Sequence, residues 1–259
     1  MNAAIDVPAG GGCFEGHFPE RPILPGVALL DLACQALAAA GERQPLRAVV
    51  FARLRQTVAP GDRLSLSART VDPQRTRVEL RRGPELVANA ELEFGPPRPV
   101  PSVQNTALGT QSEVDLRVPL DALLPHRPPM RFVTSLIAQH PDGLTCRVCI
   151  PLTCALVVDG FAPALAAVEA AAQTAAAWEA LRRLQAEAAA SPRIGYLVAL
   201  RDVSFFAARI PADRALLARV QLEDMALPLT HYRFELSLAG ATLATGRIAT
   251  YLTPAQADG

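Results

Sequence analysis

The sequence predicts an α+β protein built from two copies of one plan, in which a helix is followed by antiparallel strands. Each half contains one apolar helical segment, and extended runs separated by turn residues follow each of them. A helix that precedes such strands buries its apolar face best when the sheet wraps around it. We therefore expect two sheets, each curved around its own helix.

In the first half, prolines define where the helix starts. Pro19, Pro22 and Pro25 exclude a helix upstream, and from Gly26 onward apolar residues recur at helical spacing until Gly41. A short leading segment precedes the proline-rich loop. The expected strands are residues 46–57, 63–71, 75–82 and 85–94.

The second half repeats the plan with a longer, alanine-rich helix from about Pro163 to Ala190. Charged and amide residues interrupt this segment, so it does not read as a membrane span. The expected strands are residues 115–120, 132–140, 144–151, 195–206, 214–223, 231–239 and 241–252. Because residues 95–114 are rich in Pro, Ser, Thr and Gly, we expect domains at 1–96 and 115–259 joined by a linker at 97–114.

Composition excludes several classes of protein. The 259-residue chain has 25 basic residues, all Arg, and 25 acidic residues, and this zero formal net charge argues against a nucleic-acid binder. We find no signal peptide and no long apolar run, so we expect a cytoplasmic protein without a membrane span. Five cysteines make a disulfide framework improbable, and the pair Cys146 and Cys149 lies in a predicted strand, which points to buried thiols.

The segment from Gly16 to Gln35 carries the clearest chemistry. His17 lies on the stiff proline loop, and Asp31 follows fourteen residues later on the first turns of the helix. The N–H groups of Gly26 and Val27 at the helix start can hold a developing oxyanion. An imidazole base, a carboxyl acid and an oxyanion site together suit the removal of water beside a thioester.

This segment, GHFPERPILPGVALLDLACQ, closely resembles the signature of the β-hydroxyacyl–acyl-carrier-protein dehydratases of bacterial fatty acid synthesis. The resemblance implies that His17 and Asp31 are catalytic and that Gly26 is the backbone amide donor. An Asp at position 31 is also the choice of the short dehydratases of aryl-polyene pigment clusters. Residues 51–55 and 58–64 match the strand that follows the helix in this family. The fold implied is a double hot-dog, an intrachain pseudo-dimer.

The second half departs from this pattern. Its helix repeats the acid and amide pair as Glu169 and Gln173, but the position fourteen residues before Glu169 is Ala155. Pro163 and Ala164 stand where Pro25 and Gly26 stand in the first half. Upstream, the run from Leu124 to Met130 resembles the opening of the second, histidine-poor dehydratase-like protein of aryl-polyene clusters.

In homodimeric relatives the histidine of one subunit works with the acid of the other. The resemblance therefore implies one composite site of His17 and Glu169, and a degenerate site in which Asp31 faces Ala155. We favour a structural role for His126, with a base for the Asp31 side as the alternative. Ala164 is a second candidate oxyanion donor.

The expected reaction is the elimination of water from a 3-hydroxyacyl thioester on acyl carrier protein or coenzyme A. No cofactor or metal is expected, because the four histidines are scattered along the chain. An arginine patch for the acidic carrier protein is expected near Arg21, Arg53 and Arg55. The candidates for the substrate tunnel are Phe18, Pro25, Gln35 and Gln173.

Two alternatives remain open at this point. A hot-dog thioesterase would hydrolyse the same thioester, and a non-catalytic subunit of a polyene or polyketide synthase would hold acyl chains without converting them. The acyl chain length, the isomerase activity and further homo-oligomerisation are not determined by the sequence.

Overall fold

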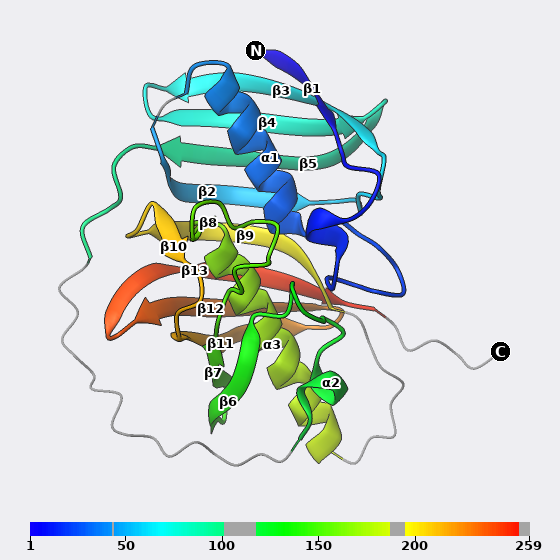
Figure 1. Ribbon diagram of the computed structural model, residues 1–259, viewed down its shortest axis with the longest axis vertical. Coiled ribbons are helices and arrows are strands. Elements are labelled where there is room, and N and C mark those ends of the chain that lie inside the picture. Colours follow the sequence, from blue (N-terminus) through cyan, green and yellow to red (C-terminus); the bar gives the residue numbers. More distant parts are fainter. Residues whose placement is uncertain (43, 101–117, 187–194, 254–259) are drawn as a thin grey trace.

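The computed structural model describes residues 1–42, 44–100, 118–186 and 195–253. Eleven strands form one continuous sheet in the order β1-β3-β4-β5-β2-β9-β13-β12-β11-β7-β6. Two helices, α1 (Gly26–Ala39) and α3 (Ala166–Gln185), lie against the same side of this curved sheet (Figure 1).

The first half surrounds α1. Its strands are β1 (Asn2–Asp6), β2 (Leu46–Leu54), β3 (Arg63–Asp72), β4 (Arg75–Arg82) and β5 (Glu85–Phe94), and a short 3-10 helix, η1 (Gly12–Phe14), precedes the proline loop. The helix ends in a Schellman motif, in which the N–H groups of Gly41 and Glu42 donate to the carbonyls of Ala38 and Leu37. Gly41 has a φ of 112°, which suits glycine at this position.

The second half surrounds α3. Its strands are β6 (Val133–His140), β7 (Gly143–Val148), β9 (Gly195–Phe205), β11 (Leu216–Ala226), β12 (Leu229–Leu238) and β13 (Ala241–Leu252). Trp178 of α3 is 1 % exposed and packs edge-on against Tyr232 of β12. The helix α3 is therefore the centre of its own core, as α1 is in the first half.

The two halves join edge to edge through β2 and β9. These strands pair antiparallel, with Val49 opposite Val203 and Ala52 opposite Leu200, and all four residues are buried. The two expected sheets are thus continuous with each other. This joint places the start of α1 close to α3, so the loops that precede the two helices meet across the middle of the molecule (Figure 1).

Several expectations need correction. Residues 118–120 are not a strand: Val118 and Pro119 are irregular and α2 (Leu120–Leu123) begins there, because Pro119 starts a helical turn. The two-stranded antiparallel sheet of β8 (Phe161–Pro163) and β10 (Arg209–Pro211) is not among the expected elements, and α3 begins at Ala166, after β8. Cys149 follows the end of β7 and is only half-buried, whereas Cys146 is fully buried.

Parts of other expectations lie outside the described residues. These parts are most of the linker at 97–114, the start of the predicted strand 115–120, and the end of the predicted helix at 187–190. The division into two domains stays a prediction. Within the described ranges, none of the helices combines the length and the apolar character that a membrane crossing requires.

Candidate active site

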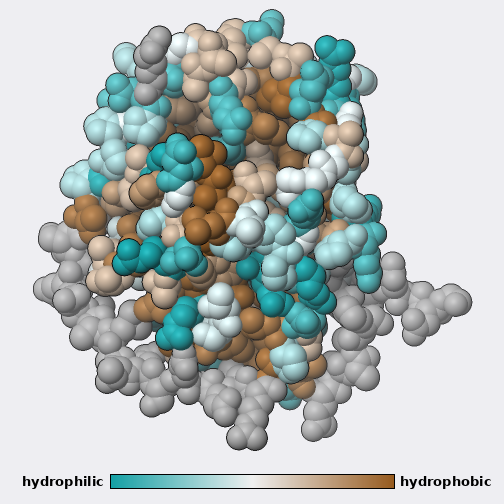
Figure 2. Space-filling view, viewed as in Figure 1, coloured by the Kyte–Doolittle hydropathy of each residue, from teal (hydrophilic) through white to brown (hydrophobic). Residues whose placement is uncertain are grey.

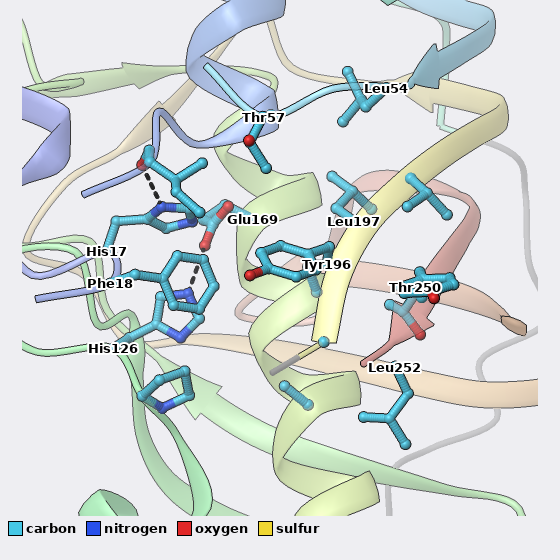
Figure 3. A pocket seen from close by; sticks show the side chains of 18 of the residues that line it. His17, Phe18, Leu54, Thr57, His126, Glu169, Tyr196, Leu197, Thr250 and Leu252 are labelled. Atoms are coloured by element: carbon cyan, nitrogen blue, oxygen red, sulfur yellow. Dashed lines mark hydrogen bonds and ion pairs between the residues drawn. The ribbon is translucent and has the colours of Figure 1, made fainter. Parts of the chain in front are cut away.

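A cavity of about 360 Å³ lies where the two halves meet, and it contains the histidine of the proline loop (Figure 3). We call it the His17 cavity. Its polar end is formed by His17, His126 and Glu169, which come from three separate segments. The remainder is lined mainly by residues of β9, β13 and the end of β2, including Leu54 and Leu197.

The loop that carries His17 is fixed by a glycine. Gly16 has a φ of 77°, and a Cβ built on it would lie 2.1 Å from the carbonyl oxygen of Arg127. The Arg127 N–H donates to the Gly16 carbonyl at 2.7 Å, so the two backbones touch. Only glycine permits both this conformation and this approach, which brings His126 of the second half beside His17.

The orientation of the His17 ring is determined by one hydrogen bond. Its Nδ1 lies 2.8 Å from the carbonyl oxygen of Ile23, so Nδ1 carries the proton and donates it to that oxygen. The Nε2 atom is then left with its lone pair. Burial lowers the pKa of His17 below the ordinary 6.5, while the Glu169 carboxylate and the bond to Ile23 oppose this shift. The neutral, basic form is thereby favoured at neutral pH.

Glu169 lies in the first turn of α3 and is 4 % exposed. Its Oε1 accepts a hydrogen bond from Gln173 Nε2 at 2.9 Å. Gln173 is completely buried, and it also donates to the Met130 carbonyl at 2.7 Å and accepts from the Phe132 N–H at 2.7 Å. Gln173 therefore positions Glu169 and ties α3 to the segment that follows His126.

His126 belongs to this cluster and not to the Asp31 side, where the sequence alternative placed it. Its Nε2 lies 3.5 Å from Glu169 Oε1, and its ring centroid lies 5.2 Å from that of His17. The Glu169 carboxylate points between the two imidazole rings (Figure 3). Burial, together with the nearby His17 and Arg127, lowers the pKa of His126 well below 6.5, so the ring is neutral. The buried Nδ1 of His126 has no hydrogen-bond partner among the residues that the structure describes.

The start of α1 reaches the same cavity. Gly26 lines it, and a Cβ at Gly26 would lie 2.3 Å from Leu54 Cδ1, so a larger residue here would require the Leu54 side chain to move. The first N–H groups of a helix have no partner inside the helix. Gly26 is thus placed as a candidate oxyanion donor, whereas Val27 and Pro25 are buried outside the cavity lining.

Ala164 does not line the His17 cavity, because it lies just before α3. It lines a second cavity of about 530 Å³, together with Asp31 and Ala155. We call this the Asp31 cavity. Asp31 Oδ2 accepts a hydrogen bond from Gln35 Nε2 at 2.7 Å, which mirrors the bond between Glu169 and Gln173. Among the described residues that line this cavity there is no histidine, and Asp31 shares the lining with Ala155.

The other candidates divide between the two cavities. Phe18 lines the His17 cavity, and its ring lies 5.9 Å from that of Tyr196 on β9, a residue that sequence reasoning missed. Gln35 lines the Asp31 cavity instead. Of the three arginines, Arg55 lines the His17 cavity and Arg53 lies on a separate surface hollow with Arg201, while Arg21 lines neither.

The histidines are scattered along the sequence, but the fold brings two of them next to a carboxylate, so their spacing in the sequence does not exclude a metal site. One nitrogen of His17, one of His126 and one carboxylate oxygen of Glu169 lie within 4.8 Å of one another. Two imidazoles and a carboxylate are a donor set that zinc accepts. The same three groups also form an acid–base pair without a metal, since a lone pair of His17 and the carboxyl of Glu169 face one space.

Comparison with known families shows which family the chain belongs to. The ApeP-like model, which describes the ApeP dehydratase, matches residues 118–258, more than half of the 259-residue chain. The chain belongs to the ApeP-like dehydratase family. The ApeI-like model, of the ApeI dehydratase, matches residues 1–89, so the two halves match the two dehydratases in the predicted order. A dehydratase function in fatty acid, polyene or polyketide synthesis, as the sequence predicted, is supported.

Curated relatives match about a third of the chain. The 3-hydroxyacyl-[acyl-carrier-protein] dehydratase FabZ of Bacillus velezensis is 38% identical over 104 residues, which cover 34% of this chain and 72% of the relative. FabZ of Legionella pneumophila strain Lens is 38% identical over 94 residues, covering 30% of this chain and 63% of the relative. This chain thus spans about two thirds of the length of each.

Solved structures match over nearly the whole chain. The dehydratase domain of PpsC from Mycobacterium tuberculosis has a TM-score of 0.72 at 18% identity, covering 98% of this chain and 93% of that domain. A monomeric dehydratase domain from a trans-AT polyketide synthase split module has a TM-score of 0.71 at 14% identity, covering 98% and 99%. These similarities confirm the double hot-dog fold.

Proposed function

We propose that the chain removes water from a 3-hydroxyacyl thioester to give the trans-2-enoyl thioester, and that the reaction takes place in the His17 cavity. The observation that carries this proposal is the pairing of His17 with Glu169 across the two halves. The hydrogen bond from His17 Nδ1 to the Ile23 carbonyl orients the ring and leaves its Nε2 free to act as a base, close to the buried carboxyl group of Glu169.

The elimination uses three groups. Nε2 of His17 takes the proton from C2, which the thioester makes acidic, while the N–H of Gly26 holds the thioester oxygen as negative charge develops there. The bond from C3 to oxygen breaks, and the Glu169 carboxyl orients the departing hydroxyl and gives it a proton. The products are the enoyl thioester and one water, and the proton on His17 returns to Glu169 to reset the site.

His126 and Gln173 are positioning residues in this scheme. The neutral His126 ring approaches Glu169 Oε1 from one side, and Gln173 donates to the same oxygen. Phe18 and Tyr196 close the polar end of the cavity with apolar rings. A site that excludes bulk water in this way strengthens the charge interactions inside it.

The substrate is carried on phosphopantetheine, and an acyl carrier protein is the proposed partner. A carrier protein is acidic, and Arg55 at the cavity lining offers a positive group for it. Because the two halves match ApeI and ApeP dehydratases, a polyene or polyketide acyl chain is the proposed substrate class.

Product analysis tests the proposal. The purified chain is mixed with a 3-hydroxyacyl carrier-protein thioester and, separately, with the matching coenzyme A thioester, and the acyl group is weighed by mass spectrometry. Loss of one water from the carrier-bound thioester is expected. Release of free acid would favour a thioesterase, and an unchanged substrate that stays bound would favour a non-catalytic acyl-binding subunit; either result would refute the proposal.

A further inference from the structure

The Asp31 cavity has no part in the proposed reaction, although its volume exceeds that of the His17 cavity. It has a volume of about 530 Å³, compared with about 360 Å³ for the His17 cavity. Its lining comes from α1, from η1 and from the loop before α3. The His17 cavity is lined in part by the loop before α1 and by α3, whereas the Asp31 cavity is lined in part by the loop before α3 and by α1.

The Asp31 cavity keeps most of the polar parts of the His17 cavity. Asp31 takes the place of Glu169 and is held by Gln35, as Glu169 is held by Gln173. Ala164 and Leu165, at the start of α3, take the place of Gly26 at the start of α1. The missing part is the base, because Ala155 has no ring nitrogen.

The rest of the lining suits an acyl chain. It is mostly apolar, and its members include Phe14, Leu24, Ala28, Leu32, Leu156 and Leu165. Binding cavities for small molecules combine such walls with a few polar groups at fixed places. Asp31, partly buried against this wall, is the polar group here, and burial raises its pKa above the ordinary 3.8.

The rim of the cavity offers both apolar surface and a positive charge. Val158 is 60% exposed and Phe161 is 42% exposed, and Figure 2 shows apolar side chains gathered on this face near β8. The guanidinium of Arg209 lies 5.2 Å from the centre of the Phe161 ring, and its Nη2 donates to the Val158 carbonyl at 2.6 Å. Arg209 is exposed, and the one hydrogen-bond partner recorded for its guanidinium among the described residues is a neutral carbonyl, so its charge can meet a phosphate.

We propose that the Asp31 cavity is a second binding site for an acyl phosphopantetheine thioester, which it holds without converting it. The acyl chain occupies the apolar cavity, the thioester lies near Asp31 and the start of α3, and the phosphate lies at Arg209. The choice of ligand class rests on the proposed function. Each chain then binds two thioesters and converts one of them.

The number of thioesters that bind to each chain tests this proposal directly. Octanoyl phosphopantetheine has no 3-hydroxyl group and cannot lose water, so its binding can be measured by titration calorimetry without turnover. We expect two equivalents to bind per wild-type chain. Ala155→Trp fills the Asp31 cavity from an exposed loop, and we expect this variant to bind one equivalent and to dehydrate the substrate at the wild-type rate. Ala172→Trp fills the His17 cavity, and we expect this variant to bind one equivalent and to show no dehydration.

The inference is overturned if the wild type binds only one equivalent, and if this binding is lost in Ala172→Trp but retained in Ala155→Trp. It is also overturned if the wild type binds no equivalent. A probe with a diazirine in the acyl chain provides the same test without any substitution, by locating labelled peptides. Labelling of α1 around Asp31, in addition to the His17 cavity, is expected. Two bound equivalents without any dehydration of the 3-hydroxy substrate would refute the proposed function and leave this inference standing.

A gain of activity supplies a second readout. In a His17→Ala background, Ala155→His adds an imidazole opposite Asp31, at an exposed position where the ring has room. The introduced ring would take the C2 proton, and Asp31 would protonate the leaving hydroxyl. We expect measurable dehydration that a further Asp31→Asn removes. Retention of that activity in Asp31→Asn would contradict binding in this cavity.

Discussion

The buried amide of Gln173 gives the sharpest prediction about how the site is held together. Gln173→Leu keeps the size of the side chain but removes its hydrogen bonds to Glu169, the Met130 carbonyl and the Phe132 N–H. Each buried polar group left without a partner costs about 1 to 3 kcal/mol. Three such groups predict a loss of about 3 kcal/mol or more in the free energy of unfolding, out of a typical total of about 5 to 15 kcal/mol.

The matched control is Gln35→Leu, at the equivalent position of the other helix. Gln35 is exposed and its side chain makes one hydrogen bond, to Asp31, so a change within about 0.5 kcal/mol is expected. Urea unfolding followed by circular dichroism measures both variants. We also expect a lower kcat for Gln173→Leu alone, because Glu169 loses the donor that orients it. Equal losses of stability in the two variants would refute this account of the site.

Three further predictions concern the histidines and the loop that joins them. Since burial lowers the pKa of His17, kcat/KM should fall in acid with a midpoint below pH 6.5, and a pH profile with a midpoint above that value would contradict the assignment of His17 as a buried base. Gly16→Ala forces a Cβ against the Arg127 carbonyl and should lower kcat at least about tenfold, a size of effect typical of misplaced catalytic groups. The control is Gly83→Ala, which is also at positive φ but in open space and should retain full turnover. The pKa values of His17 and His126 are lowered by folding, so the unfolded chain binds more protons below pH 6.5 and the melting temperature should fall with pH there. His126→Phe should flatten that dependence, and an unchanged slope would count against a buried neutral His126.

Much of the fold could be predicted because local pattern and tertiary packing agree. The strands Arg75–Arg82, Glu85–Phe94 and Ala241–Leu252 have the predicted bounds, and α1 runs from Gly26 to the turn at Gly41. Proline and glycine mark these boundaries in the sequence itself. The continuous sheet was not predicted, because the pairing of β2 with β9 depends on how two separate halves meet.

The site, like the fold, could be predicted from the sequence only in part. The family resemblance implied that His17 works with Glu169, and the fold brings a nitrogen of His17 and a carboxylate oxygen of Glu169 within 4.8 Å of each other. The sequence favoured a structural role for His126 and did not place it beside His17, because the contact between the His126 loop and the His17 loop depends on the backbone approach at Gly16, which has no periodic pattern. Ala164 was assigned to the wrong cavity for a related reason: the two helix starts face different cavities once the halves are paired.

The central claim is that one composite site, His17 with Glu169, performs the dehydration. The most direct measurement compares kcat/KM on one 3-hydroxyacyl carrier-protein thioester for the wild type, His17→Ala, Glu169→Gln and Asp31→Asn. We expect both His17→Ala and Glu169→Gln to lose about 100-fold or more, as general acid and base groups do, and Asp31→Asn to match the wild type. Full activity of Glu169→Gln together with loss of activity in Asp31→Asn would contradict the claim.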